Sequence, residues 1–164
     1  MAHTPALLRS AGLRATAQRT AVLEVLTEGR TGEEHLTAAA VAERVRARLG
    51  DISTQAVYDC LDAVTRAGLA SRIEPAGHPA RYEARTGDNH HHLVCRACGL
   101  VRDVDCAVGA PPCMTPADDH GFSLETAEVT YWGLCSQCAQ ASTGDEAGAP
   151  APVPAPVTTE RTVR

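Results

Sequence analysis

The sequence predicts an α+β fold, in which an N-terminal unit of helices and a short hairpin precedes a smaller unit with short strands. Three observations support this prediction. Apolar residues recur at helical spacing up to Gly68, two strand-like segments follow it, and six of the seven cysteines fall between residues 93 and 140. Helices followed by a hairpin are the order of a winged helix-turn-helix.

The first three helices are expected within residues 5–49. Pro5–Gly12 forms a short helix, and Thr16 can cap a second helix that ends near Gly29. Ala38–Leu49 forms the third. Its predicted buried face consists of Val41, Val45 and Leu49.

The fourth helix begins after Ser53, a good N-cap residue, and stops before Gly68. Its apolar residues lie at i, i+3, i+4 and i+7, so they form one buried stripe: Val57, Cys60, Leu61 and Val64. Cys60 is therefore expected to act as a small buried hydrophobe. The polar residues of the first turns face outward. Strands over Leu69–Ile73 and Ala80–Glu83, joined by a Pro- and Gly-containing turn, complete this unit.

Composition divides the chain into four segments: a helix-rich unit at 1–85, a polar hinge at 86–92, a cysteine-rich domain at 93–140, and a tail at 141–164. The tail is rich in Ala, Pro, Thr and Val and is predicted to be disordered. The chain carries a formal net charge of -5, but residues 1–85 have 11 Arg against 10 acidic residues, whereas residues 86–164 have 4 Arg against 10. Any surface that meets phosphate is therefore expected in the first unit.

No apolar run approaches the roughly 18–20 residues of a membrane span, and residues 1–14 lack the apolar core of a secretion signal. We therefore expect a cytoplasmic protein with no membrane partner. Seven cysteines in such a protein indicate metal ligands or redox thiols before structural disulfides.

The fourth helix suits a DNA recognition helix. Its first turns offer polar side chains to base edges, and three arginines outside it are candidate phosphate contacts. The candidate DNA-binding residues are Ser53, Thr54, Gln55, Tyr58, Arg19, Arg72 and Arg81. A solvated amphipathic helix in an all-helical core explains the same pattern. Asp59 and Asp62 on the outward face argue against DNA because carboxylates repel phosphates.

Two Cys-x-x-Cys pairs, Cys95/Cys98 and Cys135/Cys138, are the strongest local signal. Each turn brings two thiolates together, and two turns complete a tetrahedral zinc site that pins the start of the domain to its end. Either pair alone is also compatible with a redox dithiol. Cys106 and Cys113 flank a Gly/Pro loop and are either redox-active or simply tolerated.

A second group combines imidazoles and carboxylates. His90, His91 and His92 lie near Glu83 upstream and Asp103 downstream, a donor set that suits Fe(II), Mn(II) or Zn(II). In an extended segment alternate side chains share a face, so His90 and His92 are expected to point together and His91 away. A solvated histidine run in a linker is the alternative.

These motifs together resemble the ferric uptake regulator (Fur) superfamily, and are most similar to its actinobacterial branch that regulates catalase-peroxidase genes. The resemblance covers residues 6–140. It rests on Arg14-x-Thr16-x-Gln18-Arg19, His35-x-Thr37-Ala38, Ile52-Ser53-x-x-x-Val57-Tyr58, Arg81-Tyr82-Glu83, His90-His91-His92-Leu93-Val94-Cys95-x-x-Cys98-Gly99 and Tyr131-Trp132-Gly133-Leu134-Cys135-x-x-Cys138.

The resemblance implies a winged helix-turn-helix followed by a small α/β dimerisation domain with a structural zinc site. It implies a homodimer in which Cys95, Cys98, Cys135 and Cys138 hold zinc. It further implies a regulatory Fe(II) or Mn(II) site formed by His35, Glu83, His90, His92 and Asp103. The family also has an additional metal site, and this sequence matches it poorly, with His91 as a plausible ligand.

The resulting prediction is a metal-dependent repressor that binds a palindromic DNA operator, has no small-molecule substrate, and controls iron homeostasis or oxidative-stress genes. A thiol-redox or zinc-responsive regulator, and a metal buffer without a DNA role, remain alternatives. A zinc hydrolase is disfavoured because nothing else in the sequence resembles a nucleophile or an oxyanion hole, so we expect no enzyme.

Overall fold

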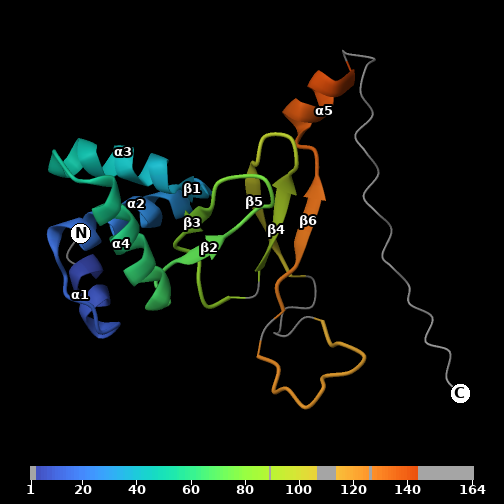
Figure 1. Cartoon of the computed structure of the whole chain (residues 1–164), viewed down its shortest axis with the longest axis horizontal. Coiled ribbons are helices and arrows are strands. Elements are labelled where there is room, and N and C mark those ends of the chain that lie inside the picture. Colours follow the sequence, from blue (N-terminus) through green and yellow to red (C-terminus); the bar gives the residue numbers. More distant parts are fainter. Residues whose placement is uncertain (1–2, 89, 107–113, 126, 144–164) are drawn as a thin grey trace, which may run out of the picture.

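The computed structural model describes residues 3–88, 90–106, 114–125 and 127–143 and has the predicted α+β architecture (Figure 1). Helices α1–α4 and a small sheet form one end of the molecule, and a second sheet with α5 forms the other. The helices are α1 (His3–Ser10), α2 (Ala17–Thr31), α3 (Ala38–Leu49), α4 (Thr54–Arg66) and α5 (Ser136–Thr143).

Hydroxyl side chains begin three of the helices. Thr16, Thr37 and Ser53 each accept a hydrogen bond from the backbone N–H three residues further on, which satisfies a donor that the first turn leaves free. The predicted caps at Thr16 and Ser53 are confirmed. Helix α2 continues two residues past the predicted end at Gly29, and α1 begins at His3 rather than Pro5.

The core of the helical unit is aliphatic. The predicted stripe of α4 is buried and packs with the apolar faces of α2 and α3. Its fully buried side chains include Leu8, Val22, Leu23, Val25, Leu26, Val41, Val45, Val57, Leu61 and Val64. The prediction for Leu49 was wrong: this side chain is 41% exposed because it is the last residue of α3 and extends past the packed part of the helix.

The first sheet has the strand order β1-β3-β2, with β1 (Leu36–Thr37), β2 (Ser71–Ile73) and β3 (Arg81–Glu83). Strands β2 and β3 are the predicted hairpin, or wing. Strand β1 was not predicted, because two residues are too short to show an alternating pattern. Leu36 pairs with Tyr82, so His35, one residue earlier, lies opposite Glu83 in the same register.

The second sheet has the order β5-β4-β6, with β4 (His90–Cys95), β5 (Val101–Asp105) and β6 (Thr130–Gly133). Antiparallel pairing of β4 with β5 sets His92 opposite Asp103, and parallel pairing with β6 sets Cys95 opposite Gly133. The histidines therefore lie in a strand and not in the predicted hinge at 86–92, because pairing with β5 begins at His90.

At the other end of this domain, α5 includes residues 141–143, which were predicted to belong to the tail. The rest of that tail, 144–164, lies outside the described residues. Among the helices of the described ranges, none has the length and apolar character needed to span a membrane.

Candidate metal centres and DNA-binding surface

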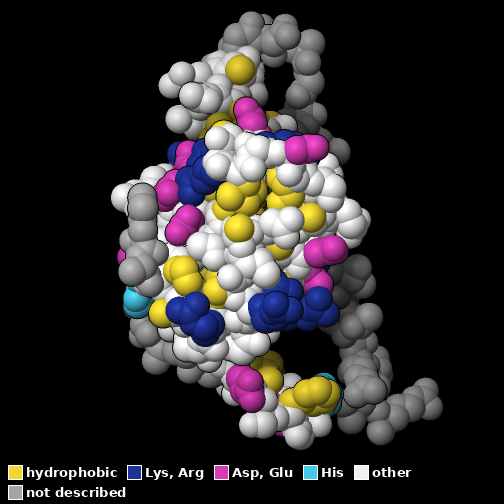
Figure 2. Space-filling model, turned by 90° about the vertical axis from the view of Figure 1, so that its left-hand side faces the viewer, with side chains coloured by type: hydrophobic (Ala, Val, Ile, Leu, Met, Phe, Trp, Pro, Cys, Tyr) yellow, Lys and Arg dark blue, Asp and Glu magenta, His cyan; other side chains and the backbone are white. Residues whose placement is uncertain are grey.

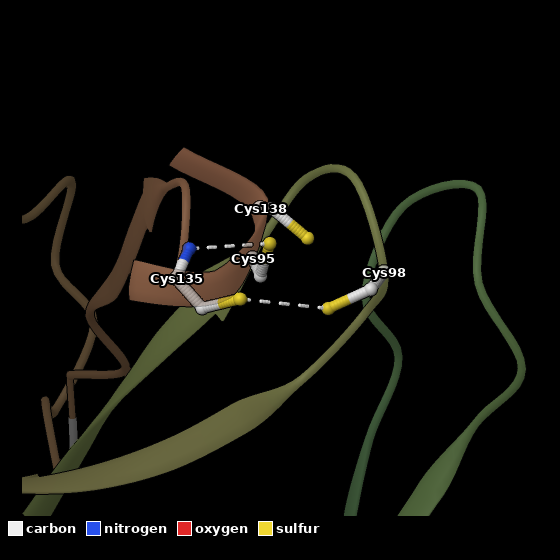
Figure 3. A group of neighbouring side chains, drawn as sticks. All are labelled: Cys95, Cys98, Cys135 and Cys138. Atoms are coloured by element: carbon white, nitrogen blue, oxygen red, sulfur yellow. Dashed lines mark hydrogen bonds between the residues drawn. The ribbon is translucent and has the colours of Figure 1, made fainter. Parts of the chain in front are cut away.

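The four predicted zinc ligands converge at one end of the second sheet. Cys95 ends β4 and Cys98 follows in the next turn, while Cys135 and Cys138 stand at the start of α5 (Figure 3). All four Sγ atoms lie within 4.8 Å of one another. The Sγ atoms of Cys98 and Cys135 are 3.8 Å apart, and Figure 3 shows the four side chains pointing toward a common centre.

The electrostatics of this group suit a cation. The backbone N–H of Cys135 donates to Sγ of Cys95 at 3.3 Å, and this hydrogen bond lowers the pKa of Cys95 to about 6. Hydrogen bonds of the Cys138 thiol with the sulfurs of Cys135 and Cys98 stabilise its protonated form and raise its pKa to about 12. A divalent cation would take the place of the shared protons among four converging sulfurs, so the donor set fits zinc.

The other cysteines stand apart from this centre. Cys60 is buried in α4, where burial raises the pKa of its thiol, and this agrees with the predicted hydrophobic role. Cys106 is half-buried. Cys113 lies outside the described residues.

A second cluster joins the two halves of the molecule. It consists of His35, directly before β1, Glu83 at the end of β3, and His92 and Asp103 from the second sheet, with one donor atom of each within 4.8 Å of the others. Nε2 of His35 is 2.8 Å from Oδ1 of Asp103 and 3.3 Å from Oε2 of Glu83. Nε2 of His92 is 3.3 Å from Oε1 of Glu83. A cavity of about 290 Å³ opens beside this cluster.

Several donor atoms of this cluster are close together without proper hydrogen-bond geometry. Both ring nitrogens of His35 and Oδ1 of Asp103 are buried and have no hydrogen-bond partner. Glu83 is only 3% exposed. Burial raises the pKa of Glu83, but close contacts with the imidazoles of His35, His92 and His90 outweigh it and hold the pKa far below its usual range. An ionised carboxylate facing unpartnered imidazole nitrogens fits a divalent cation.

His90 and His92 share one face of β4, as predicted. Their ring centroids are 5.0 Å apart, while His91 is buried on the other face. Nε2 of His90 lies 3.1 Å from Oε1 of Glu83 but 3.9 Å from Oδ1 of Asp103. His90 therefore borders the four-donor group and can complete it as a fifth ligand.

Two arginines beside this cluster have contacts that sequence reasoning did not identify. Arg81 was a candidate phosphate contact, but its Nη1 donates to the carbonyl oxygen of His35 at 3.0 Å, so it braces the segment that carries this ligand. Arg85 contacts the carboxylates of Asp88, Asp103 and Asp105. An arginine two residues after Glu83 and three before Asp88 was visible in the sequence, but its partner in β5 was not.

The predicted recognition surface lies on the helical unit, at the end of the molecule opposite the four-cysteine group. Ser53, Thr54 and Gln55 are exposed at the start of α4, and Tyr58 is half-exposed on its outer face. Gln55 donates to Asp59 at 2.8 Å, which engages that acidic side chain within the helix. Figure 2 shows arginine side chains gathered in the lower part of the face in view, and others higher up beside acidic side chains.

Two other predicted DNA contacts lie on this unit. Arg19 is half-buried in α2 and donates through Nη1 to the carbonyl oxygen of Arg14 at 3.3 Å. Arg72 is exposed on the wing and pairs with Glu74 at 2.9 Å. Both guanidinium groups therefore sit beside α4 or on the hairpin next to it, where phosphates flank a recognition helix.

A winged helix-turn-helix joined to a second sheet, with one group of potential metal ligands at the end of that sheet and another between the two halves, is typical of a metal-binding, DNA-binding transcriptional regulator. Residues 10–132 match the ferric uptake regulator family, and the chain belongs to that family. Members of this family are transcriptional regulators and not enzymes.

Known relatives agree with this assignment. The chain is 52% identical over 136 residues to the transcriptional regulator FurA of Mycobacterium tuberculosis, covering 83% of this chain and 90% of that protein. It is 55% identical over 126 residues to ferric uptake regulation protein 1 of Mycolicibacterium fortuitum, covering 77% and 76%. The fold resembles the crystal structure of the Vibrio cholerae ferric uptake regulator, with a TM-score of 0.60, 24% identity, and coverage of 80% and 98%.

Proposed function

We propose that this regulator is a homodimeric, metal-dependent repressor that binds a palindromic operator and controls iron homeostasis or oxidative-stress genes, including catalase-peroxidase genes. Zinc at the four cysteines has a structural role. Fe(II) or Mn(II) at the second cluster has the regulatory role. The name of the Mycolicibacterium fortuitum relative, a ferric uptake regulation protein, supports the iron targets, and the donor chemistry of the two clusters supports the division of roles.

The observation that carries the proposal is the origin of the second donor set. His35, directly before β1, and Glu83 in β3 belong to the DNA-binding unit, whereas His92 and Asp103 belong to the second sheet. A divalent cation, when bound, supplies the positive charge that holds the two carboxylates together. The four side chains thereby favour one angle between the DNA-binding unit at 1–85 and the domain that begins at β4. A ligand that binds one conformation better than another shifts the equilibrium between them toward that conformation.

In a dimer, the angle between the two domains determines the affinity for DNA. The second sheet exposes Leu93 and Tyr131, which pair across β4 and β6, beside an apolar hollow of about 230 Å³ that half-exposed Trp132 also lines. An apolar patch of this kind suits a second copy of the chain. In such a dimer the interdomain angle sets the spacing of the two α4 helices, and an operator with matching half-sites binds only the metal-favoured state.

The DNA-binding residues in this proposal are Ser53, Thr54, Gln55 and Tyr58 for base edges, and Arg19, Arg72 and Arg81 for phosphates. Arg81 has a second role, because its Nη1 also supports the backbone of His35.

The test is a gel shift with a duplex from the protein's own upstream region under reducing conditions. We expect Mn(II) or Fe(II) to tighten binding about 10-fold or more and a chelator to reverse it, within the coupling typical of allosteric sites. His92→Ala should remain folded and zinc-loaded but lose this response. Equal affinity for the operator with and without metal refutes the proposal, and no binding in either state favours a metal buffer.

A second measurement distinguishes iron from peroxide as the signal that the regulator senses. If peroxide is sensed at the iron-loaded cluster, its oxidation of a ligating imidazole adds 16 Da to the peptide that carries His35 or His90. Mass spectrometry of the protein after peroxide treatment detects this mass. Its absence, with DNA binding retained, points to iron sensing alone.

A further inference from the structure

We propose that Arg85 is a positioning residue for the second cluster. The guanidinium group of Arg85 orients Asp103 and His90 and fastens the linker between the two halves, residues 84–88, to the second sheet. This inference rests on the proposed function, because it assumes that the cluster binds a regulatory metal.

The guanidinium group of Arg85 contacts three carboxylates through three different nitrogens. Nε donates to Oδ2 of Asp88 at 2.6 Å, Nη2 to Oδ1 of Asp105 at 2.6 Å, and Nη1 to Oδ2 of Asp103 at 3.3 Å. A planar fork with fixed donor directions holds carboxylates in defined orientations, which a flexible ammonium cannot do. These contacts tie the linker between β3 and β4 to the second sheet, because Asp88 lies in the linker and the other two carboxylates lie in β5.

The first consequence concerns the orientation of Asp103. Arg85 contacts its Oδ2, while its Oδ1 lies 2.8 Å from Nε2 of His35. The two oxygens of the carboxylate are therefore divided between the guanidinium group and the cluster. With Oδ2 engaged, Asp103 presents a single oxygen to a cation, so Arg85 favours one-oxygen coordination.

The second consequence concerns the proton on His90. Oδ1 of Asp88 lies 2.7 Å from Nδ1 of His90, and its other oxygen receives the hydrogen bond from Arg85. A carboxylate only accepts, so Nδ1 of His90 donates to Asp88, while Nε2 faces Oε1 of Glu83 at 3.1 Å. A cation bound at Nε2 would take the place of a proton there, and the hydrogen bond to Asp88 would keep the remaining proton on Nδ1. Carboxylates that hold a histidine in this way fix its tautomer and its ring orientation for metal binding.

The burial of these groups separates this arrangement from an ordinary surface ion pair. The side chains of Asp103 and His90 are largely buried, and that of Arg85 is 24% exposed. The arm to Asp105 is different, because Asp105 is 86% exposed and solvent screens it. The arm to buried Asp103 therefore carries the positioning, together with the arm to Asp88, which is 45% exposed but also contacts the buried ring of His90. The Asp105 arm serves as an internal comparison.

The experiment is a titration of the full-length, zinc-containing protein with Co(II), whose absorption spectrum reports on the ligands. We expect Arg85→Gln to weaken Co(II) binding about 10- to 100-fold, as is typical when a partner of a metal ligand is lost. The d–d bands of the residual complex should shift because Asp103 is free to offer both oxygens. Arg85→Lys should rescue binding only in part.

Matched variants isolate the effect. Arg66→Gln removes the same charge from an exposed pair with Asp62 on α4, and we expect wild-type affinity and an unchanged spectrum. Asp105→Asn should also stay close to wild type. If Arg85→Gln binds Co(II) with the affinity and spectrum of Arg66→Gln, the inference is overturned.

Another variant tests the underlying site. Asp103→Ala removes a proposed ligand, so wild-type Co(II) affinity in that variant refutes the site and hence the proposed function. Loss of affinity in Asp103→Ala together with wild-type behaviour of Arg85→Gln overturns only the role of Arg85.

A metal-free readout completes the test. With zinc present and the second cluster without metal, amide hydrogen exchange of residues 84–88 should be faster in Arg85→Gln than in Arg66→Gln, because the linker has lost its fastening. Should Arg85→Gln lose zinc or unfold, Asp88→Ala carries the test, since it cuts the arm to His90 alone. About 10-fold weaker Co(II) binding in Asp88→Ala supports the inference, and wild-type binding overturns it.

Discussion

The wing packs against the turn of the first Cys-x-x-Cys pair, and a single substitution tests this contact. His78 lies in the turn between β2 and β3, and Gly99 directly follows Cys98. Nε2 of His78 lies 3.3 Å from the carbonyl oxygen of Arg96. A Cβ at Gly99 would lie 2.7 Å from both Cγ and Nδ1 of His78, distances that real side chains do not tolerate. Gly99→Ala should therefore detach the wing from this turn.

The cost of Gly99→Ala has two parts. Gly99 has a φ of +67°, and a residue with a Cβ in this left-handed region costs about 1–2 kcal/mol. The clash involves atoms near the root of the His78 side chain, so the imidazole must change rotamer and give up its hydrogen bond, at a cost of about 1 kcal/mol. The free energy of unfolding should therefore fall by about 2–3 kcal/mol in total.

Gly77→Ala is the matched control, because Gly77 is next to His78, has a φ of +78°, and has open space where a Cβ would lie. It should lose only the backbone part, about 1–2 kcal/mol. Urea denaturation of both zinc-loaded variants gives the comparison, with zinc content checked by metal analysis. In a His78→Ala background the cost of Gly99→Ala should drop to that of Gly77→Ala. Equal costs of the two glycine substitutions in the wild-type background would refute the proposed contact.

Three further predictions concern the core and the cysteines. Leu61→Ala should lower the free energy of unfolding by about 2–5 kcal/mol, since Leu61 is fully buried at the centre of the α4 stripe, and a smaller loss in urea denaturation would contradict that packing. Cys98→Ser should abolish stoichiometric zinc binding and lower the melting temperature, because one of four converging thiolates is removed; wild-type zinc content by metal analysis would exclude the four-cysteine site. Cys60 should react with iodoacetamide at pH 8 only after unfolding, because burial raises the pKa of its thiol and so reduces the thiolate; rapid labelling of the native protein, followed by mass spectrometry, would show that the helix is not packed as described.

The residues predicted correctly are those whose environment is set by their neighbours in the chain. Ser53 caps α4 and Val57, Cys60, Leu61 and Val64 are buried, because helical periodicity is a local property. The convergence of the four cysteines was predicted from their spacing, since a Cys-x-x-Cys turn brings two thiolates together whatever the rest of the fold does. The errors lie at the ends of elements: Leu49 is exposed, and β4 begins within the expected hinge.

The second cluster marks the limit of sequence reasoning. From the residues alone, Glu83, Asp103 and the histidines formed a plausible donor set, but His35 entered only through family resemblance. Its position depends on β1, a strand of two residues whose pairing with β3 sets His35 opposite Glu83. Arg85 is a similar case, because its partners Asp103 and Asp105 are 18 and 20 residues away in the sequence. They come near Arg85 only when β5 pairs with β4.

Helices, their caps, the cysteine pairs and the class of regulator follow from the order of residues along the chain, because these features depend on short-range geometry and on the chemistry of side chains a few positions apart. The contacts between the two halves are different. The convergence of His35 with Asp103, the role of Arg85 and the docking of His78 on Gly99 exist only once two sheets have formed and packed together, because strand register and domain packing bring together atoms that the chain itself holds far apart.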